Sequence, residues 1–421
     1  MRVLLVCLLL SSVAVQAQEE TTDIVPADEQ KLEWGGNLDA KYVFFHTSPG
    51  TPMYRLQFLQ SGETSSWLSQ YRIEPYLNAD YRTKDLGVHL KTHASYYSDD
   101  DASFDLFEAY GSYSPSFTTT LQAGKRMYNW GKGYAFNPVG YVNPVKDPEN
   151  PELAQAGLVS VNVEYVKSFS SPALQTMALA FVVIPAAPRA IERYADAGNT
   201  AIALKAYALL LDTDIDLIGY FGKNRPMRLG LDASRNLAEN LEVHGELSHD
   251  WRVPRYVIAE GKLHTSEENL SSYLVGLRYL HVSNTTVIAE YYHHGAGMNR
   301  DQFDSYAGFL ANAVSSGSGA AAQEALELNR AYFRSSTLMT DYLYVKMMVP
   351  EPFDWLYFTP SIFSIVNLND GSCLVSASLT YKPVTNVEFI VWPTFLMGGE
   401  GSEFGQKMVE QRIELWFRAF F

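Results

Sequence analysis

Apolar and polar residues alternate at a strict period of two along much of this chain, most clearly at its C-terminus. In residues 409–421 (VEQRIELWFRAFF), apolar side chains occupy every second position from Ile413 to Phe421, and charged side chains lie between them. Because successive side chains of a β-strand point to opposite faces, this segment predicts a strand with one apolar and one charged face.

Segments with the same alternation recur along the chain, and their length of about ten residues is what a tilted strand needs to cross a bilayer. Every second connection between them is a tight turn, and the others are longer loops. This is the asymmetry of bacterial outer-membrane barrels, with short periplasmic turns and long external loops. We therefore predict an all-β fold, a transmembrane antiparallel β-barrel of about 18 strands with both termini in the periplasm. The strands are expected at 38–44, 72–82, 86–94, 104–113, 117–127, 158–169, 173–184, 198–210, 214–223, 226–234, 240–251, 271–282, 284–294, 337–349, 354–367, 371–382, 386–397 and 408–421.

Some of the longer loops, which include 46–66, 128–157, 252–270 and 295–336, carry patterns of their own. Helical spacing within 295–336 is shown by Phe303, Tyr306, Leu310 and Val314. A Ser/Gly break and a segment rich in helix formers follow, which predicts a helical hairpin. The hairpin either caps the rim or folds inward and narrows the pore. Residues 53–60 suggest a small extra hairpin arm in the first external loop.

The N-terminus has the features of an export signal. A positive residue, Arg2, precedes an apolar stretch at 3–13, and 15–17 (VQA) is a small-x-small cleavage site. The apolar stretch is too short to be a membrane anchor. We expect a signal peptide at 1–17, a short periplasmic lead at 18–31 and the barrel at 32–421, with no room for a plug domain.

Composition and charge exclude some classes of protein. After the signal, no run of eighteen apolar residues exists, which excludes a helical membrane protein. Aromatic residues make up 13% of the chain and include 27 tyrosines, which suits the aromatic girdles of a barrel. The net charge of −15 argues against a nucleic-acid partner. A soluble β protein has the same bulk composition, so the strand pattern carries the fold prediction.

An alternating terminal strand that ends on an aromatic residue resembles the terminal strand of bacterial outer-membrane barrels, whose assembly machinery reads that ending. The resemblance implies location in the bacterial outer membrane. It also implies contact with outer-membrane lipid, lipopolysaccharide and the barrel-assembly machinery as partners. The residues that match the assembly signal are Ile413, Leu415, Phe417 and Phe421.

Residues 124–157 form a loop rich in proline and glycine, with Asn-Pro twice, which indicates an ordered and non-repetitive segment. Its motif resembles a loop of alginate-export-type and related substrate-specific outer-membrane porins. In those barrels the loop enters the lumen and helps to form the constriction. Alternatively, Trp130 and Phe136 only anchor the loop to the rim. The chain has no arginine-dense conduit of the kind that alginate needs. The matching residues are Arg126, Trp130, Gly131, Phe136, Asn137, Pro138, Asn143 and Pro144.

Charged residues on the strands predict two walls in the lumen, because charge facing lipid costs about 2–4 kcal/mol at mid-depth. The first three strands and the last should be neighbours and carry a net basic wall. The strands half a turn away should carry an acidic wall. The two walls either produce a transverse field across the water or pair locally so that the field cancels. The basic wall comprises Lys41, Arg72, Arg82, Lys91, Arg412 and Arg418. The acidic wall comprises Asp216, Asp232, Glu242, Glu246, Asp250 and Glu290.

Patterns for catalysis or metal binding are weak. His89 and His93 share a strand face but would lie about 13 Å apart, too far to share an ion. Residues 131–133 (GKG) lack the Lys-Ser/Thr of a phosphate loop, and 99–101 (DDD) lacks the spacing of a calcium loop. We expect no enzyme activity, no cofactor and no metal.

These patterns together predict an outer-membrane porin-like channel for passive diffusion of small hydrophilic solutes, selected by pore width and lumen charge. The alternative is a non-conducting barrel that binds surface polysaccharide or sleeves a partner protein.

Overall fold

A computed structural model describes residues 31–58, 62–99, 101–185, 200–223, 225–259, 261–316, 319–333 and 337–421. The expected signal peptide and all but the last residue of the expected periplasmic lead lie outside the described residues. Lys31, the last residue of that expected lead, is already the first residue of a strand.

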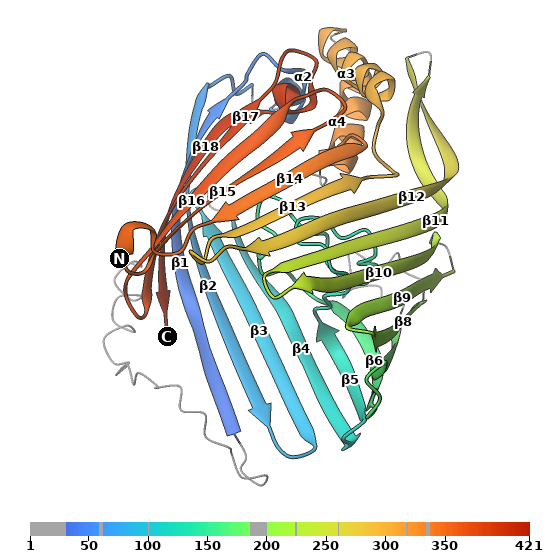
Figure 1. Cartoon of the computed structure of the whole chain (residues 1–421). Coiled ribbons are helices and arrows are strands. Elements are labelled where there is room, and N and C mark those ends of the chain that lie inside the picture. Colours follow the sequence, from blue (N-terminus) through green and yellow to red (C-terminus); the bar gives the residue numbers. More distant parts are fainter. Residues whose placement is uncertain are drawn as a thin grey trace.

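Strands make up most of the described chain. They are β1 (Lys31–Thr47), β2 (Trp67–Arg82), β3 (Leu86–Tyr97), β4 (Ala102–Ser116), β5 (Thr119–Arg126), β6 (Leu158–Ser168), β7 (Leu174–Ile184), β8 (Ala201–Leu210), β9 (Thr213–Gly222), β10 (Met227–Ala238), β11 (Leu241–Ala259), β12 (Lys262–Leu280), β13 (Thr286–His293), β14 (Asp341–Met348), β15 (Phe358–Asn367), β16 (Cys373–Val384), β17 (Val387–Met397) and β18 (Val409–Phe420). Each pairs antiparallel with its neighbours in the chain, and β1 pairs with β18, so the 18-stranded sheet closes (Figure 1). The predicted antiparallel barrel is confirmed.

The alternation of the sequence becomes an apolar outside and a polar inside. On β18, Ile413, Leu415 and Phe417 are 39%, 43% and 39% exposed, whereas Glu414 and Trp416 between them are buried. The same contrast holds on strands far from β18, where exposed leucines alternate with buried carboxylates. The exposed set forms the apolar belt that a bilayer requires, and the buried set faces the lumen.

The barrel closes where the first and last strands of the chain meet. The backbone N–H of Phe421 donates to the carbonyl of Gly36 at 3.0 Å, and the N–H of Gly36 donates to the carbonyl of Phe421 at 2.9 Å. The Phe421 ring lies 6.3 Å from that of Trp34 on β1. The terminal aromatic residue therefore completes the hydrogen-bonded seam between the first strand and the last.

Helices gather at the end of the barrel that carries the long loops (Figure 1). The predicted helical hairpin is present as α3 (Arg300–Ser315) and α4 (Gly319–Phe333). Its buried face includes Phe303, Tyr306 and Leu310 and joins one apolar cluster with residues of β14 and β15. A short helix, α5 (Glu403–Gln406), lies between β17 and β18 at the same end, whereas the 3-10 helix η1 (Pro352–Asp354) lies in the turn between β14 and β15 at the opposite end. Within the described residues, no helix is long and apolar enough to cross a membrane.

Two predictions for the external loops were wrong. The hairpin arm expected at 53–60 is replaced by α2 (Pro52–Gln57), which begins with Thr51 as its N-cap and buries Met53, Tyr54 and Leu56. Residues 59 and 60 lie outside the described residues. Residues 252–270 are not an irregular loop. Strands β11 and β12 continue past the barrel as a two-stranded ribbon, from the pair Val253–Glu268 to the pair Ala259–Lys262. A register shift between Asp250 and Val253 marks where the ribbon leaves the barrel.

Candidate functional site: the loop across the lumen

Residues 127–157, between β5 and β6, form a loop that lies inside the barrel (Figure 1). Its atoms contact side chains of β11, β13, β14 and β18, which are far from β5 around the barrel. The loop therefore crosses the lumen instead of following the rim.

Two asparagines of the motif hold the start of this loop in a compact turn. The side-chain amides of Asn137 and Asn143 both donate to the carbonyl of Trp130, the second at 2.7 Å. The N–H of Trp130 donates to Asn143 Oδ1 at 2.9 Å. Gly131 follows with a φ of +94°, and a Cβ there would lie 2.1 Å from Asn137 Oδ1. Only glycine fits this position, so the turn depends on the motif as a unit.

Aromatic residues of the motif pack on the inner wall. Trp130 is 6% exposed and belongs to a cluster with inward-facing residues of β7, β8 and β9. Phe136 stacks on Tyr292, with ring centroids 4.5 Å apart and an interplanar angle of 17°. Arg126 ends β5 and donates to Gln122. Pro138 is part of the same turn, and Pro144 lines the cavity described below.

Carboxylates of the predicted acidic wall bind the backbone of this loop. Glu246 on β11 accepts the N–H groups of Lys132 and Gly133, both at 2.6 Å, and of Val139 at 3.2 Å. Glu290 on β13 accepts those of Tyr134 at 2.5 Å and Ala135 at 2.9 Å. Five loop amides thus point at two carboxylates that are almost fully buried.

The other residues of the acidic wall have partners on the loop, on the wall or on both. Asp216 forms ion pairs with Lys132 of the loop at 3.1 Å and with Lys205 of β8 at 3.2 Å. Asp232 lies 4.0 Å from the Lys132 ammonium. Asp250 pairs with Arg228 at 3.4 Å and accepts a hydrogen bond from Ser248, whose hydroxyl also bonds Tyr141 of the loop. Glu242 lines the cavity described below, 3.7 Å from His244.

Most cations of the predicted basic wall pair along their own wall. Lys41 is buried and lies 2.6 Å from Glu74 on β2. Arg418 binds Asp39 through two nitrogens at 2.7 and 2.8 Å, across the seam between β18 and β1. Arg72 donates to Gln70, Arg82 is largely exposed beside Asp80, and Lys91 lines the cavity. The structure thus places Lys41 and Arg418 together at the seam and leaves Arg82 and Lys91 apart from them.

The middle of the loop reaches the basic wall. Glu149 binds Arg412 of β18 at 2.7 Å, and Arg412 also binds Glu414 at 2.8 Å. Burial, with the neighbouring Glu149 carboxylate, raises the pKa of Asp147. Lys146 donates to the carbonyls of Gly133 and Tyr134, and burial lowers its pKa while Glu246 and Glu290 act in the opposite direction. One loop therefore joins the two walls.

A cavity of about 780 Å³ remains beside the loop. It lies toward the short turns, because its lining includes Thr286 and Met348, at the turn-side ends of β13 and β14. Lys132 and Lys346 in this lining have carboxylate neighbours in Asp216 and Glu152. Within the described residues, no carboxylate forms an ion pair with the other three cations. The cations of the lining are Lys91, Lys132, Lys146, Arg278 and Lys346, and the carboxylates are Glu108, Glu152 and Glu242.

Sequence reasoning did not find Lys146, Glu149 or Lys346 as part of this site. Lys146 and Glu149 stand in a proline-rich stretch without strand periodicity, so no face could be assigned to them. Lys346 does alternate with apolar residues on β14, and that pattern was the available signal. The partnership of 131–133 with Glu246 had no sequence signal, because more than a hundred residues separate them.

No protein-family model matches the chain, and no curated protein is similar to it in sequence. Solved structures of porins are similar in fold. The BenF-like porin of Pseudomonas fluorescens Pf-5 has a TM-score of 0.55 at 10% identity over 93% of this chain and 98% of that one. OccK2 (OpdF) of Pseudomonas aeruginosa, solved with glucuronate, has 0.53 at 9% over 93% and 98%. OccAB3 of Acinetobacter baumannii has 0.51 at 11% over 93% and 99%. At these identities the likeness establishes a shared barrel fold.

Proposed function

We propose that this protein is an outer-membrane porin-like channel for passive diffusion of small hydrophilic solutes, with no enzyme activity. Three features support the proposal: the closed barrel, its apolar outer belt and the loop that restricts the lumen without filling it. In this arrangement the long loops and helices face outside, and lipid and lipopolysaccharide surround the belt. The barrel-assembly machinery would read the terminal strand, including Phe421.

We further propose that small anions are the preferred solutes. The observation that carries this is the cavity lining, in which Lys91, Lys146 and Arg278 form no ion pair with any carboxylate that the structure describes. A cation without a fixed counter-charge attracts a mobile anion, most strongly where the protein walls lower the dielectric. OccK2, whose structure holds glucuronate, shows that a barrel of this fold accepts a small organic anion.

The basic wall and the acidic wall are both expected to contribute little to selectivity, for different reasons. Because Lys41, Arg412 and Arg418 each have a carboxylate partner, we expect them to contribute little to the field in the water. Because Glu246 and Glu290 face loop amides, we expect their charge to be largely screened. The selective field would come from the cavity cations. Alginate export lacks a supporting feature, since the cavity lining contains a single arginine.

Reversal potential across a planar bilayer in a salt gradient tests the proposal. Wild-type channels should prefer anions. Changing Lys91, Lys146 and Arg278 together to Gln should lower the anion-to-cation permeability ratio about fivefold, since one charge acting at a few ångströms contributes about 1 kcal/mol or more. The matched control changes Lys31, Arg82 and Lys382 to Gln, because these three side chains are more than half exposed.

An equal shift in both triple variants would show that the cavity cations are not selective. The same bilayer experiment separates the alternative function. A barrel that binds surface polysaccharide or sleeves a partner protein, and conducts little, would give no stable channels in any variant.

A further inference from the structure

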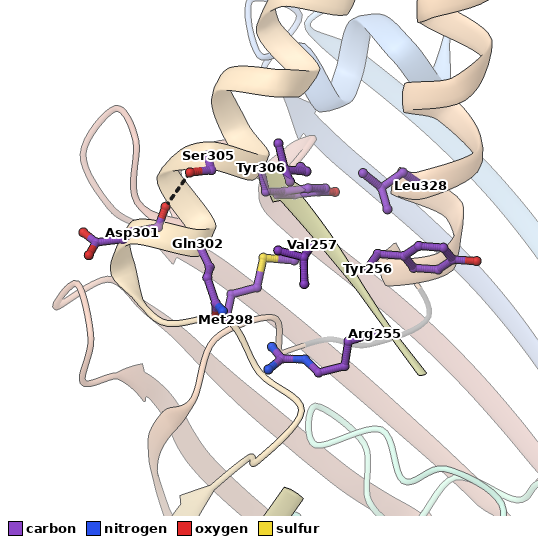
Figure 2. A pocket seen from close by; sticks show the side chains of 10 residues that line it. Arg255, Tyr256, Val257, Met298, Asp301, Gln302, Ser305, Tyr306 and Leu328 are labelled. Atoms are coloured by element: carbon purple, nitrogen blue, oxygen red, sulfur yellow. Dashed lines mark hydrogen bonds between the residues drawn. The ribbon is translucent and has the colours of Figure 1, made fainter. Parts of the chain in front are cut away.

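A groove runs along α3 at the end of the barrel that carries the long loops. One part of it, of about 140 Å³, lies between the β11 ribbon and the start of α3 (Figure 2). A second part, of about 400 Å³, continues along α3 toward the ribbon tip at Gly261. Both parts share Ile258 and Ser305 in their linings, so they adjoin along α3 and are together called the groove.

The groove wall on α3 lies beside the face of the helix that packs on α4, and Tyr306 and Ala313 belong to both. Its residues recur every three or four positions, as residues on one helix face do. The packed face carries Phe303, Tyr306 and Leu310. Outside the packed face, most α3 residues that line the groove are polar or small, and they include Asp301, Ser305, Gly308, Asn312 and Ser316.

Gly308 has no structural reason to be glycine. It lies inside a helix, where glycine costs about 1 kcal/mol relative to alanine. A Cβ at Gly308 would meet nothing within 4 Å, and its φ is not in the left-handed region. The residue's effect is instead to keep the floor of the groove open.

The lining combines aromatic surface with uncharged polar groups. Tyr256 of the ribbon is 48% exposed, and Phe309 borders the second part of the groove. Among the described residues, none hydrogen-bonds the side-chain amide of Asn312. The one cation, Arg255, already binds Glu268 at 2.9 Å and the carbonyl of Gly297 at 2.9 Å. Figure 2 shows the Asp301 carboxylate pointing away from the other lining side chains.

We propose that this groove binds a neutral oligosaccharide. Aromatic faces accept the C–H faces of sugar rings, and amides and hydroxyls exchange hydrogen bonds with sugar hydroxyls. Among the described lining residues, an anionic ligand would find no cation other than Arg255, which is already paired. A volume of about 400 Å³ suits a short chain of sugars. The proposal depends on the proposed function for one point only, the location of the groove on the external side of the membrane. There it would hold a glycan beside the channel mouth.

Calorimetric titration of the full-length barrel, in a detergent without sugar head groups, tests the proposal. The probes are neutral oligosaccharides of glucose and of N-acetylglucosamine, with a polyuronate and an unstructured peptide for comparison. We expect at least one neutral probe to bind. Gly308→Phe fills the open floor and should weaken binding about tenfold, which equals about 1.4 kcal/mol. Tyr256→Ala and Asn312→Leu should each weaken it less.

Ala311→Phe is the matched control, because Ala311 is an exposed residue of α3 outside the groove lining. It should leave affinity unchanged, and heat-modifiable migration should show that every variant is folded. Absence of binding to all neutral probes, or equal weakening by both phenylalanine variants, would overturn the proposal. Tighter binding of the polyuronate or the peptide would overturn the ligand class. Channel conductance is measured separately, so its loss would count against the proposed function and not against the groove.

Discussion

The acidic half and the basic half of the barrel wall have different structural roles. On the acidic half, Glu246 and Glu290 take five backbone N–H groups from the loop that crosses the lumen. On the basic half, Lys41 and Arg418 pair with carboxylates of adjacent strands, across β1–β2 and across the seam between β18 and β1. The acidic half holds the start of the loop, whereas the basic half closes the barrel and contacts the loop through the Arg412–Glu149 pair.

This difference shows that the sign of charge along a strand does not determine the field in the lumen. A buried charge must be compensated by a partner, because desolvation costs several kcal/mol per ion. On the acidic half, backbone N–H groups compensate Glu246 and Glu290, and cations compensate Asp216 and Asp250. On the basic half, the compensating groups are carboxylates. Under the proposed function, the charges that act on a solute are those of the cavity beside the loop, where Lys91, Lys146 and Arg278 form no ion pair with a described carboxylate.

The largest expected effect comes from disrupting the seam between β1 and β18, which lies in the basic half of the wall. Deleting Phe421 removes two backbone hydrogen bonds to Gly36 and a ring beside Trp34. Without them the first and last strands lose pairing at the point of closure, and the terminal assembly signal is lost. We expect unfolded protein in the periplasm without heat-modifiable migration, and a severalfold fall in surface level measured by protease shaving and immunoblot.

The control for this deletion is Phe117→Ser, because Phe117 is a fully exposed aromatic residue in the turn between β4 and β5. That variant should assemble normally. Normal surface levels of the Phe421 deletion would contradict the role of the terminal residue in closure and assembly.

The next effect comes from releasing the loop from the acidic half. Changing Glu246 and Glu290 together to Ala removes the acceptors of five buried loop amides, each of which then costs about 1–3 kcal/mol if it stays unpaired. The segment 132–139 should leave the wall, so single-channel conductance should rise and become noisier while the barrel stays assembled. Planar-bilayer recordings measure both quantities.

Changing Glu242 and Asp250 to Ala is the matched control, because it removes two charges from the same wall, and neither carboxylate bonds a loop residue directly within the described part of the chain. Its conductance should stay close to that of the wild type. If both double variants conduct alike, the carboxylates at Glu246 and Glu290 do not hold the loop in place.

The barrel was predictable because a bilayer imposes its pattern locally, residue by residue. Each crossing strand must alternate, and the prediction for 158–169 differs from β6 (Leu158–Ser168) by one residue. Outside the bilayer this constraint ends. The ribbon of β11 and β12 therefore looked like a loop, and residues 53–60 did not show their helix. There, Met53, Tyr54 and Leu56 fit a helical face and Pro52 suits a first turn, which was the available signal.

The site was predictable only in parts. The motif at 124–157 and the acidic residues were each found from sequence, but their contact was not. Lys132 and Glu246 are 114 residues apart, and no local pattern indicates that a backbone amide will meet a particular carboxylate. The path of the loop decides the contact, and that path depends on packing such as Phe136 on Tyr292.

The smallest expected effect concerns the ion pair that links the loop to the basic half. Glu149 and Arg412 are 2.7 Å apart and about a quarter exposed, so the pair should contribute about 1 kcal/mol or less. Arg412 keeps Glu414 as a partner when Glu149 is changed, which limits the loss further. Glu149→Gln should therefore lower hydrogen-exchange protection around residues 147–153 and raise conductance noise slightly. Glu152→Gln is the comparison, because that carboxylate is 74% exposed and 3.8 Å from its partner Lys346. A double-mutant cycle of Glu149→Gln and Arg412→Gln isolates the pairwise contribution. If the two changes add independently, or if Glu152→Gln loosens the loop as much, the loop is held by the acidic half alone.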